Sequence, residues 1–211
     1  MKNICVHIIN INNFFPELSY YTLPTIEEFC KRIKANLNII TERKFPNQDI
    51  VTEKLQVYED GKYYDYNILL DLDILVHPQC YNPFLNNIPP THVSFKDNYD
   101  ANKQLRSDIY FERDGRNVGI SGCAVFTNKY THDLWKPIDD LTIEQINNNI
   151  LQERKIVDEY TMSRNFAKYG FKYVQPYPLD QYNLLYHLGT YGQDKEKMLD
   201  NAKTWYNYFW R

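Results

Sequence analysis

Alternating apolar and polar stretches near the start of the chain predict buried strands separated by amphipathic helices. Ile4–Ile9 has the apolar run of a buried strand, and residues 10–21 read as a polar and aromatic loop. Thr25-Ile-Glu-Glu28 matches a capping box. We therefore expect a helix to begin there, because the apolar residues that follow, Ile26, Phe29, Cys30, Ile33 and Leu37, recur at helical spacing.

The next elements continue this alternation. Residues 37–40 are expected to form a second strand, and Asp49 is expected to cap a second helix that carries Val51, Leu55 and Tyr58. A third strand follows, with the apolar run Ile68–Leu70. Strand, helix, strand, helix and strand in this order predict an α/β fold, with a mainly parallel sheet and right-handed crossovers.

Two carboxylates end the third strand. In Tyr-Asn-Ile-Leu-Leu-Asp-Leu-Asp-Ile-Leu-Val-His-Pro, an apolar run stops at Asp71 and Asp73, and apolar residues resume directly afterwards. Ligands of open α/β sheets bind at the carboxyl ends of the strands. A carboxylate pair there suits a divalent cation that also holds substrate phosphates. The alternative is that both residues merely close the strand, one as a turn or cap residue.

The second part of the chain starts with an irregular stretch. Prolines and polar residues dominate residues 78–115, which is typical of a functional or mobile loop, with a short strand or helix expected at Leu105–Arg113. A strand with two glycines is expected at residues 118–126, and Thr142-Ile-Glu-Gln145 is a second capping box.

Four elements are expected in the remaining sequence. Asp158 is expected to open a helix that ends near Gly170, and short strands are expected at residues 171–174 and 183–187. Residues 194–209 have the pattern of an amphipathic helix, whose inward side chains would be Met198, Ala202, Trp205 and Phe209.

Composition bounds the class of protein. A chain of 211 residues is long enough for one domain with a sizeable core. A net charge of −3 and a pI of about 6.0 do not mark a nucleic-acid binder, although DNA stays open as a substrate. The 19 Tyr, 11 Phe and 3 Trp suit stacking on sugars or bases, but an AT-rich coding sequence would give the same bias.

The cysteines and the N-terminus indicate a reduced compartment. The four cysteines are scattered and form neither a zinc signature nor a disulfide framework. Cys5, Cys30 and Cys123 lie in apolar patterns and are expected to be buried thiols. We see no signal peptide and no transmembrane segment, and we expect a cytoplasmic protein.

The segment Ile-Leu-Leu-Asp-Leu-Asp-Ile-Leu-Val-His-Pro resembles the metal-binding signature of nucleotide-sugar glycosyltransferases with the GT-A fold. The likeness is strongest to the glycogenin and lipopolysaccharide galactosyltransferase group and to small phage-type relatives. Three further segments follow in the order of that family: Gly119–Phe126, Asp158–Ser163 and Asn183–Gly189. The resemblance covers about residues 54–197. It implies a single GT-A-like domain over residues 1–211, with a nucleotide-sugar half at about 1–77 and an acceptor half at about 78–211.

The resemblance implies a metal site and a pair of catalytic acids. Asp71, Asp73 and His187 would bind Mn²⁺ or Mg²⁺, and an imidazole ligand would favour manganese. By the same resemblance Asp71 also touches the ribose. A lone histidine ending an apolar strand is otherwise a core residue. Asp158 and Glu159 would act on the acceptor hydroxyl or on positive charge at the sugar; alternatively, both acids complement the dipole of their helix.

The remaining implied residues would contact the nucleotide sugar. They are Ile9, Lys54, Asp71, Gly119, Ser121, Gly122 and Lys195. A solvated helix lysine is the alternative for Lys54, and a tight turn is the alternative for the glycines. The family pattern His-x-x-Gly-x-x-Lys-Pro-Trp is altered here to His-Leu-Gly-Thr-Tyr-Gly-Gln-Asp-Lys, which puts the phosphate contact of Lys195 in doubt.

The implied function is metal-dependent transfer of a sugar, with retention, from a nucleotide-diphosphate sugar such as a UDP-sugar to a hydroxyl acceptor. Glycan, protein and modified nucleic acid are all open as acceptors. One rival is a haloacid dehalogenase-like phosphatase that uses Asp71 as its nucleophile. Another is a non-catalytic sugar-binding module.

Overall fold

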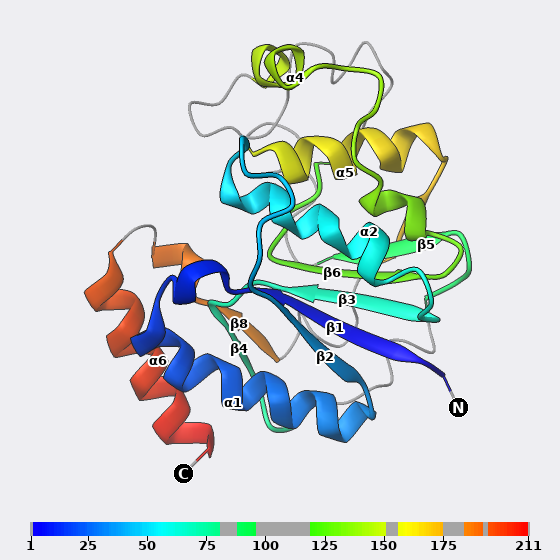
Figure 1. Cartoon of the computed structure of the whole chain (residues 1–211). Coiled ribbons are helices and arrows are strands. Elements are labelled where there is room, and N and C mark those ends of the chain that lie inside the picture. The colour runs from blue at the N-terminus through cyan, green and yellow to red at the C-terminus, as the bar shows by residue number, and fades with distance from the viewer. Residues whose placement is uncertain are drawn as a thin grey trace.

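A computed structural model describes residues 2–80, 88–95, 119–150, 156–174, 184–191 and 194–210. Its centre is a six-stranded sheet in the order β2-β1-β3-β6-β5-β7, and a separate two-stranded sheet pairs β4 with β8 (Figure 1). The strands are β1 Ile4–Ile9, β2 Asn36–Ile40, β3 Tyr66–Leu70, β4 Ile74–Val76, β5 His92–Phe95, β6 Ala124–Asn128, β7 Lys172–Tyr173 and β8 Leu185–His187.

Strand direction divides the large sheet into two regions. β1 runs parallel to both β2 and β3, as the strand–helix alternation predicted. β6 is antiparallel to β3 and β5, and β5 is parallel to β7. The helices are α1 Pro16–Ile33, α2 Val57–Asp60, α4 Ile143–Asn149, α5 Val157–Lys168 and α6 Lys195–Trp210, with 3-10 turns η1 Ile11–Asn13, η2 Ile50–Gln56, η4 His132–Trp135 and η5 Leu188–Tyr191.

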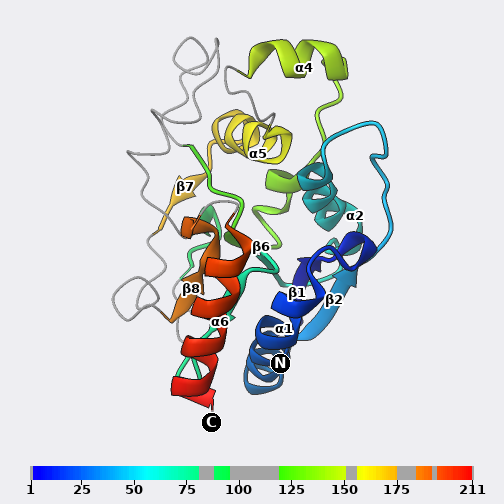
Figure 2. The same cartoon turned by 90° about the vertical axis from the view of Figure 1, so that its left-hand side faces the viewer.

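Helices cover both faces of this sheet. Ile68 and Leu70 of β3 point into a cluster with Phe29 of α1, whereas Leu69 points into a second cluster with Met162 of α5. Successive residues of a strand face opposite sides, so a run that is apolar at every position is buried on both faces. α6 packs beside α1 (Figure 2).

The predicted start of the first helix is wrong. α1 begins at Pro16, with Leu18 buried, so Thr25 lies inside the helix. The Thr25 hydroxyl donates to Thr22 O at 2.8 Å and accepts from Val76 N at 3.0 Å, so it is not free to cap a helix. The sequence 10–21 reads as a loop because few of its residues are aliphatic.

The irregular stretch after residue 78 also needs correction. It contains β5, an interior strand of the sheet, in which Val93 and Phe95 are fully buried. Prolines at 89 and 90 immediately precede this short strand and hide its pattern. The strand or helix predicted at 105–113 lies outside the described residues.

Several predicted elements are confirmed. Asp49 caps η2 by accepting from Val51 N, and Thr142 forms a capping box with Gln145. The strands expected at 37–40, 118–126, 171–174 and 183–187 correspond to β2, β6, β7 and β8.

The helix cap predicted at Asp158 is displaced, since Ile156 is the N-cap of α5. In α6, Met198 and Ala202 are buried, but Phe209 is 38% exposed.

Candidate active site

The two carboxylates lie where β3 leaves the sheet. Asp71 N–H donates to Cys123 O at 2.8 Å, which extends the pairing of β3 with β6 by one residue. Ile74 N–H then donates to Asp71 O at 3.1 Å, so the chain turns before β4 begins. This turn places Asp71 and Asp73 at the carboxyl edge of the parallel strands β1 and β3.

His187 is brought to the same edge by the small sheet. It is paired with Ile74 in the β4–β8 ladder, and Leu188 N–H donates to Asp73 O at 3.0 Å. His187 Nε2 lies 3.4 Å from Asp73 Oδ2. One ligand atom from each of Asp71, Asp73 and His187 lies within 4.8 Å of the other two.

This set of side chains fits a divalent cation. Ligands about 2.1 Å from an ion are about 3 Å apart when adjacent and about 4.2 Å apart when opposite, so only a small adjustment would bring the three groups onto one ion. Two carboxylates suit Mg²⁺ or Mn²⁺, and the imidazole favours Mn²⁺. All three side chains are partly exposed, so an ion can reach them.

Gly189 makes this cluster sterically possible. A Cβ at this position would lie 2.5 Å from His187 Nε2 and 2.9 Å from Asp73 Oδ2. Both distances are too short for non-bonded atoms, so any side chain at residue 189 would displace two of the candidate ligands. Gly189 was not among the predicted site residues; its position two residues after the histidine was the signal that could have found it.

Lys54 joins the metal cluster to the catalytic candidates. Its Nζ lies 2.7 Å from Asp71 Oδ1 and 3.4 Å from Asp158 Oδ2, and it donates to Gly122 O at 3.1 Å. The lysine is only 7% exposed and therefore is not the solvated helix residue that its polar sequence context suggests. Its element, η2, packs against α5, which carries Asp158.

Charge pairing decides the protonation of this group. Burial alone would lower the pKa of Lys54, but Asp71 and Asp158 outweigh burial and raise it above its ordinary value. Burial also raises the pKa of Asp71, against the opposing effect of Lys54. Because 26% of the Asp71 side chain stays exposed and the ammonium is 2.7 Å away, we take the pair as ionised. Burial opposes the charge of Asp73 too, yet His187 lowers its pKa.

Asp158 and Glu159 contact this group in different ways. Asp158 is 1% exposed, and its Oδ1 has no hydrogen-bond partner among the described residues. Glu159 Oε1 instead accepts from Gly122 N–H at 3.1 Å. A Cβ at Gly122 would lie 2.7 Å from Asp158 Oδ2. The absence of a side chain at Gly122 thus allows the close approach of Asp158, as expected for a glycine beside a site.

Four further residues were predicted to contact the nucleotide sugar: Ile9, Gly119, Ser121 and Lys195. Ile9 ends β1 and is paired with Ile40. Gly119 is buried, and the buried Ser121 donates to Cys123 Sγ at 3.4 Å. Lys195, at the start of α6, has its Nζ 5.3 Å from the ring centre of Phe14 and 5.2 Å from that of Phe15, and within the described part of the chain no ion pair joins it to Asp71 or Asp73.

Comparison with known proteins identifies the fold. The chain is similar to the solved structure of a glycosyltransferase involved in the glycosylation of the major capsid of PBCV-1, with 14% identity, a TM-score of 0.61 and coverage of 96% of this chain and 99% of the other. It is also similar to the bifunctional glycosyltransferase WbbM, with 10% identity and a TM-score of 0.53 over 85% of this chain and 39% of WbbM. No protein-family model and no curated sequence matches.

The fold is therefore of the GT-A type, as the resemblance of the Asp71–Asp73 segment implied. At these identities the likeness defines the fold and leaves the activity to the chemistry of the site. None of the helices in the described residues combines the length and the apolar character needed to span a membrane.

Proposed function

We propose that this protein is a metal-dependent glycosyltransferase that moves a sugar from a nucleotide-diphosphate sugar, a UDP-sugar in our proposal, to a hydroxyl acceptor. The observation that carries the proposal is the convergence of Asp71, Asp73 and His187 at the carboxyl edge of β3 in a GT-A-type sheet. Ligands of open α/β sheets bind at this edge. Neither the phosphatase nor the non-catalytic alternative has an observation of its own in its favour.

Asp71, Asp73 and His187 would hold the cation, with Mn²⁺ preferred because of the imidazole. When bound, the ion supplies neutralisation of the negative charge that grows on the leaving diphosphate. The protein contributes rigidity, since main-chain hydrogen bonds fix the backbone of Asp71 on β6 and that of Asp73 on Leu188. The carboxylates are thus held in place before the substrate arrives.

Asp158 is the candidate acid for the sugar. One of its oxygens faces Lys54, and the other is buried without a hydrogen-bond partner among the described residues. A buried carboxylate oxygen without a hydrogen-bond donor raises the free energy of the folded protein. A hydrogen bond from a sugar hydroxyl to Oδ1 would therefore be favourable. Asp158 would also face positive charge developing on the sugar ring, as in a retaining transfer. Glu159 would orient Gly122.

The acceptor is a hydroxyl of a glycan, a protein or a modified nucleic acid. Residues 96–118 of the predicted acceptor half lie outside the described part of the chain. The acceptor is therefore best found by experiment, by incubating the protein with a panel of nucleotide sugars and candidate acceptors and following product mass.

The test of the proposed function is release of nucleoside diphosphate from a nucleotide sugar, with and without Mn²⁺. We expect Asp73→Asn to abolish it, because a neutral amide is a poor ligand for a hard cation. The matched control is Asp65→Asn. Asp65 directly precedes the first residue of β3, at the end of the strand away from Asp71 and Asp73, so this variant should retain activity. Full activity of Asp73→Asn in metal-buffered solution would refute the metal site.

A further inference from the structure

The ammonium group of Lys54 is surrounded by acceptors of the protein itself. A protonated lysine has three N–H groups. In the structure its Nζ is in contact with three acceptors, Asp71 Oδ1, Gly122 O and Asp158 Oδ2. A direct contact with the nucleotide sugar, which the family resemblance implies, would require Lys54 to give up one of these partners.

The three acceptors come from three different elements. Asp71 follows β3, Gly122 precedes β6, and Asp158 lies in the first turn of α5. The side chain of Lys54 reaches them from η2 while remaining 7% exposed. The cation of Lys54 lies between the carboxylates of Asp71 and Asp158. It offsets their mutual repulsion, which would otherwise favour separation of the end of β3 from α5.

Gly122 leaves the space that this arrangement needs. A Cβ at residue 122 would lie 3.0 Å from Lys54 Nζ and 2.7 Å from Asp158 Oδ2. Lys54 and Asp158 can therefore meet beside residue 122 because that residue has no side chain.

We infer that Lys54 is a positioning residue, which fixes the spacing between the metal ligand Asp71 and the acid Asp158 and does not bind the nucleotide sugar. This inference rests on the proposed function. Under it, Lys54 and Asp158 act as one unit in catalysis. A lysine that contacted the donor phosphates would act independently of Asp158.

A double-mutant cycle separates these two roles. We expect Lys54→Met and Asp158→Asn each to lower kcat/KM by roughly 100-fold, because small misplacements in an active site have effects of this order. The double variant should then be no worse than about tenfold below the poorer single variant, since groups that act as a unit are non-additive. Multiplied effects in the double variant would overturn the inference.

Thermal unfolding gives a second readout that needs no activity. Lys54→Met leaves the buried Asp158 and the partly buried Asp71 without their cation and should lower the melting temperature by roughly 10 °C. Adding Asp158→Asn should recover part of that loss. If the losses in melting temperature of the two single variants simply added, the inferred link between Lys54 and Asp158 would be overturned. If the wild-type protein turned over no nucleotide sugar, the proposed function would fail, and the melting temperatures alone would decide whether Lys54 links Asp71 to Asp158.

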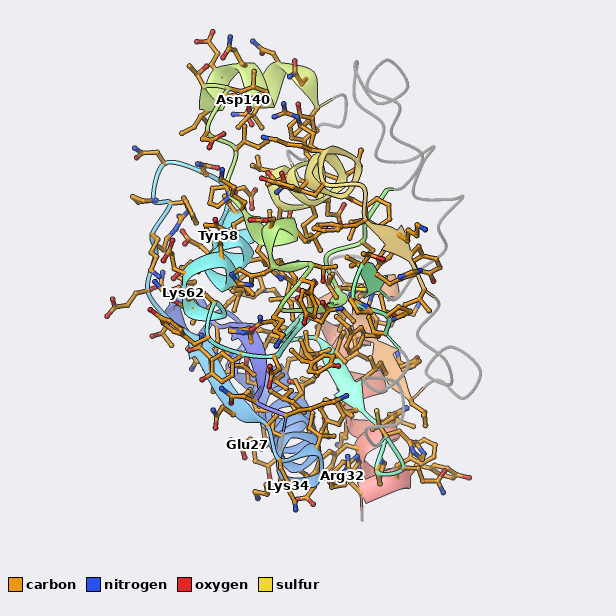
Figure 3. The ribbon with its side chains drawn as sticks, turned by 90° about the vertical axis from the view of Figure 1, so that its right-hand side faces the viewer. Glu27, Arg32, Lys34, Tyr58, Lys62 and Asp140 are labelled. Atoms are coloured by element: carbon orange, nitrogen blue, oxygen red, sulfur yellow. The ribbon has the colours of Figure 1, made fainter. Side chains whose placement is uncertain are left out.

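The matched control is Lys62→Met. Lys62 lies at the surface just beyond α2, near Tyr58 (Figure 3), and forms an exposed ion pair with Glu59. Exposed pairs of this kind contribute little to stability. Lys62→Met should therefore leave kcat/KM and the melting temperature close to those of the wild type, and an effect as large as that of Lys54→Met would overturn the specific role of Lys54.

Discussion

At the scale of single residues, two glycines matter for the space they leave and not for their backbone angles. Gly122 and Gly189 are absent from the residues with positive φ, a group that includes Gly170 at 65°. Each instead lies where a Cβ would collide with side chains of the candidate site. Substitution at either position therefore tests the geometry of the site and leaves its chemical groups in place.

We expect Gly189→Ala to weaken Mn²⁺ binding by about tenfold or more, as displacement of a metal-ligating histidine from its support does. The new methyl would lie 2.5 Å from His187 Nε2 and must move it. Calorimetric titration with Mn²⁺ measures the effect.

Gly170→Ala is the control for this variant. It strains a left-handed residue at the end of α5 and should cost about 1 kcal/mol of stability while leaving Mn²⁺ affinity unchanged. Equal Mn²⁺ affinities for both variants and the wild type would contradict a metal site at His187.

Sequence reasoning predicted the types of the site residues better than their environments. Asp71, Asp73 and His187 were predicted from an apolar strand that ends in carboxylates and from a family pattern, and the structure brings them together. The burial of Lys54 was not predictable from local sequence. Its ion pairs join residues of η2, β3 and α5, and such contacts depend on packing between elements.

At the scale of elements, one sequence motif has two outcomes. Thr25-x-x-Glu28 and Thr142-x-x-Gln145 both match a capping box, but only the second forms one. Packing explains the difference. The residues before Thr25 include Leu18, which is buried with Met198 of α6, so tertiary contacts extend α1 by nine residues towards its start, from Thr25 to Pro16.

Thr25 links α1 to β4, the strand that follows Asp73. We expect Thr25→Val to lower the free energy of unfolding by about 1–3 kcal/mol, because Val76 N–H loses its buried acceptor. Since β4 holds His187 through the ladder, Mn²⁺ affinity should fall as well. Urea unfolding and Mn²⁺ titration together measure both effects.

Thr142→Ala serves as the comparison at similar cost to stability. It removes the cap of α4, for about 1 kcal/mol, and α4 contributes no residue to the metal cluster. If both variants lost Mn²⁺ affinity equally, the effect would be a general consequence of destabilisation and not a property of β4.

At the scale of the whole molecule, the sheet buries the imidazole of His7 between its strands. His7 of β1 is fully buried; its Nε2 lies 2.9 Å from Asn67 Oδ1, and its Nδ1 lies 3.2 Å from Asn38 Nδ2. The neutral ring, with Nε2–H donating and Nδ1 accepting, satisfies both contacts. Burial accordingly lowers the pKa of His7 to about 4 from 6.5.

This shift predicts a loss of stability in mild acid. Between pH 6.5 and about 4 the unfolded chain binds a proton at His7 and the folded protein does not, so stability falls as the pH falls through this window. From about pH 7.5 to about pH 4.5 the contribution is about 2–3 kcal/mol. Urea unfolding of the wild type and of His7→Gln at both pH values isolates it.

The comparison of the wild type with His7→Gln provides its own control. Acidic groups that titrate in this range affect wild type and His7→Gln alike, and the four other histidines are retained in both. The wild type should therefore lose about 2–3 kcal/mol more than the variant. Parallel losses would show that His7 is protonated in the folded state.

The pairing of β4 with β8 also has a consequence for how the protein is made. Asp71 and Asp73 emerge from the ribosome well before His187, so the nascent chain carries the two carboxylates while their imidazole partner is still untranslated. Domains generally fold as units, and β4 has no ladder partner among the described strands until β8 has been made. The three groups of the proposed metal site therefore come together only late in translation, once β8 has been made.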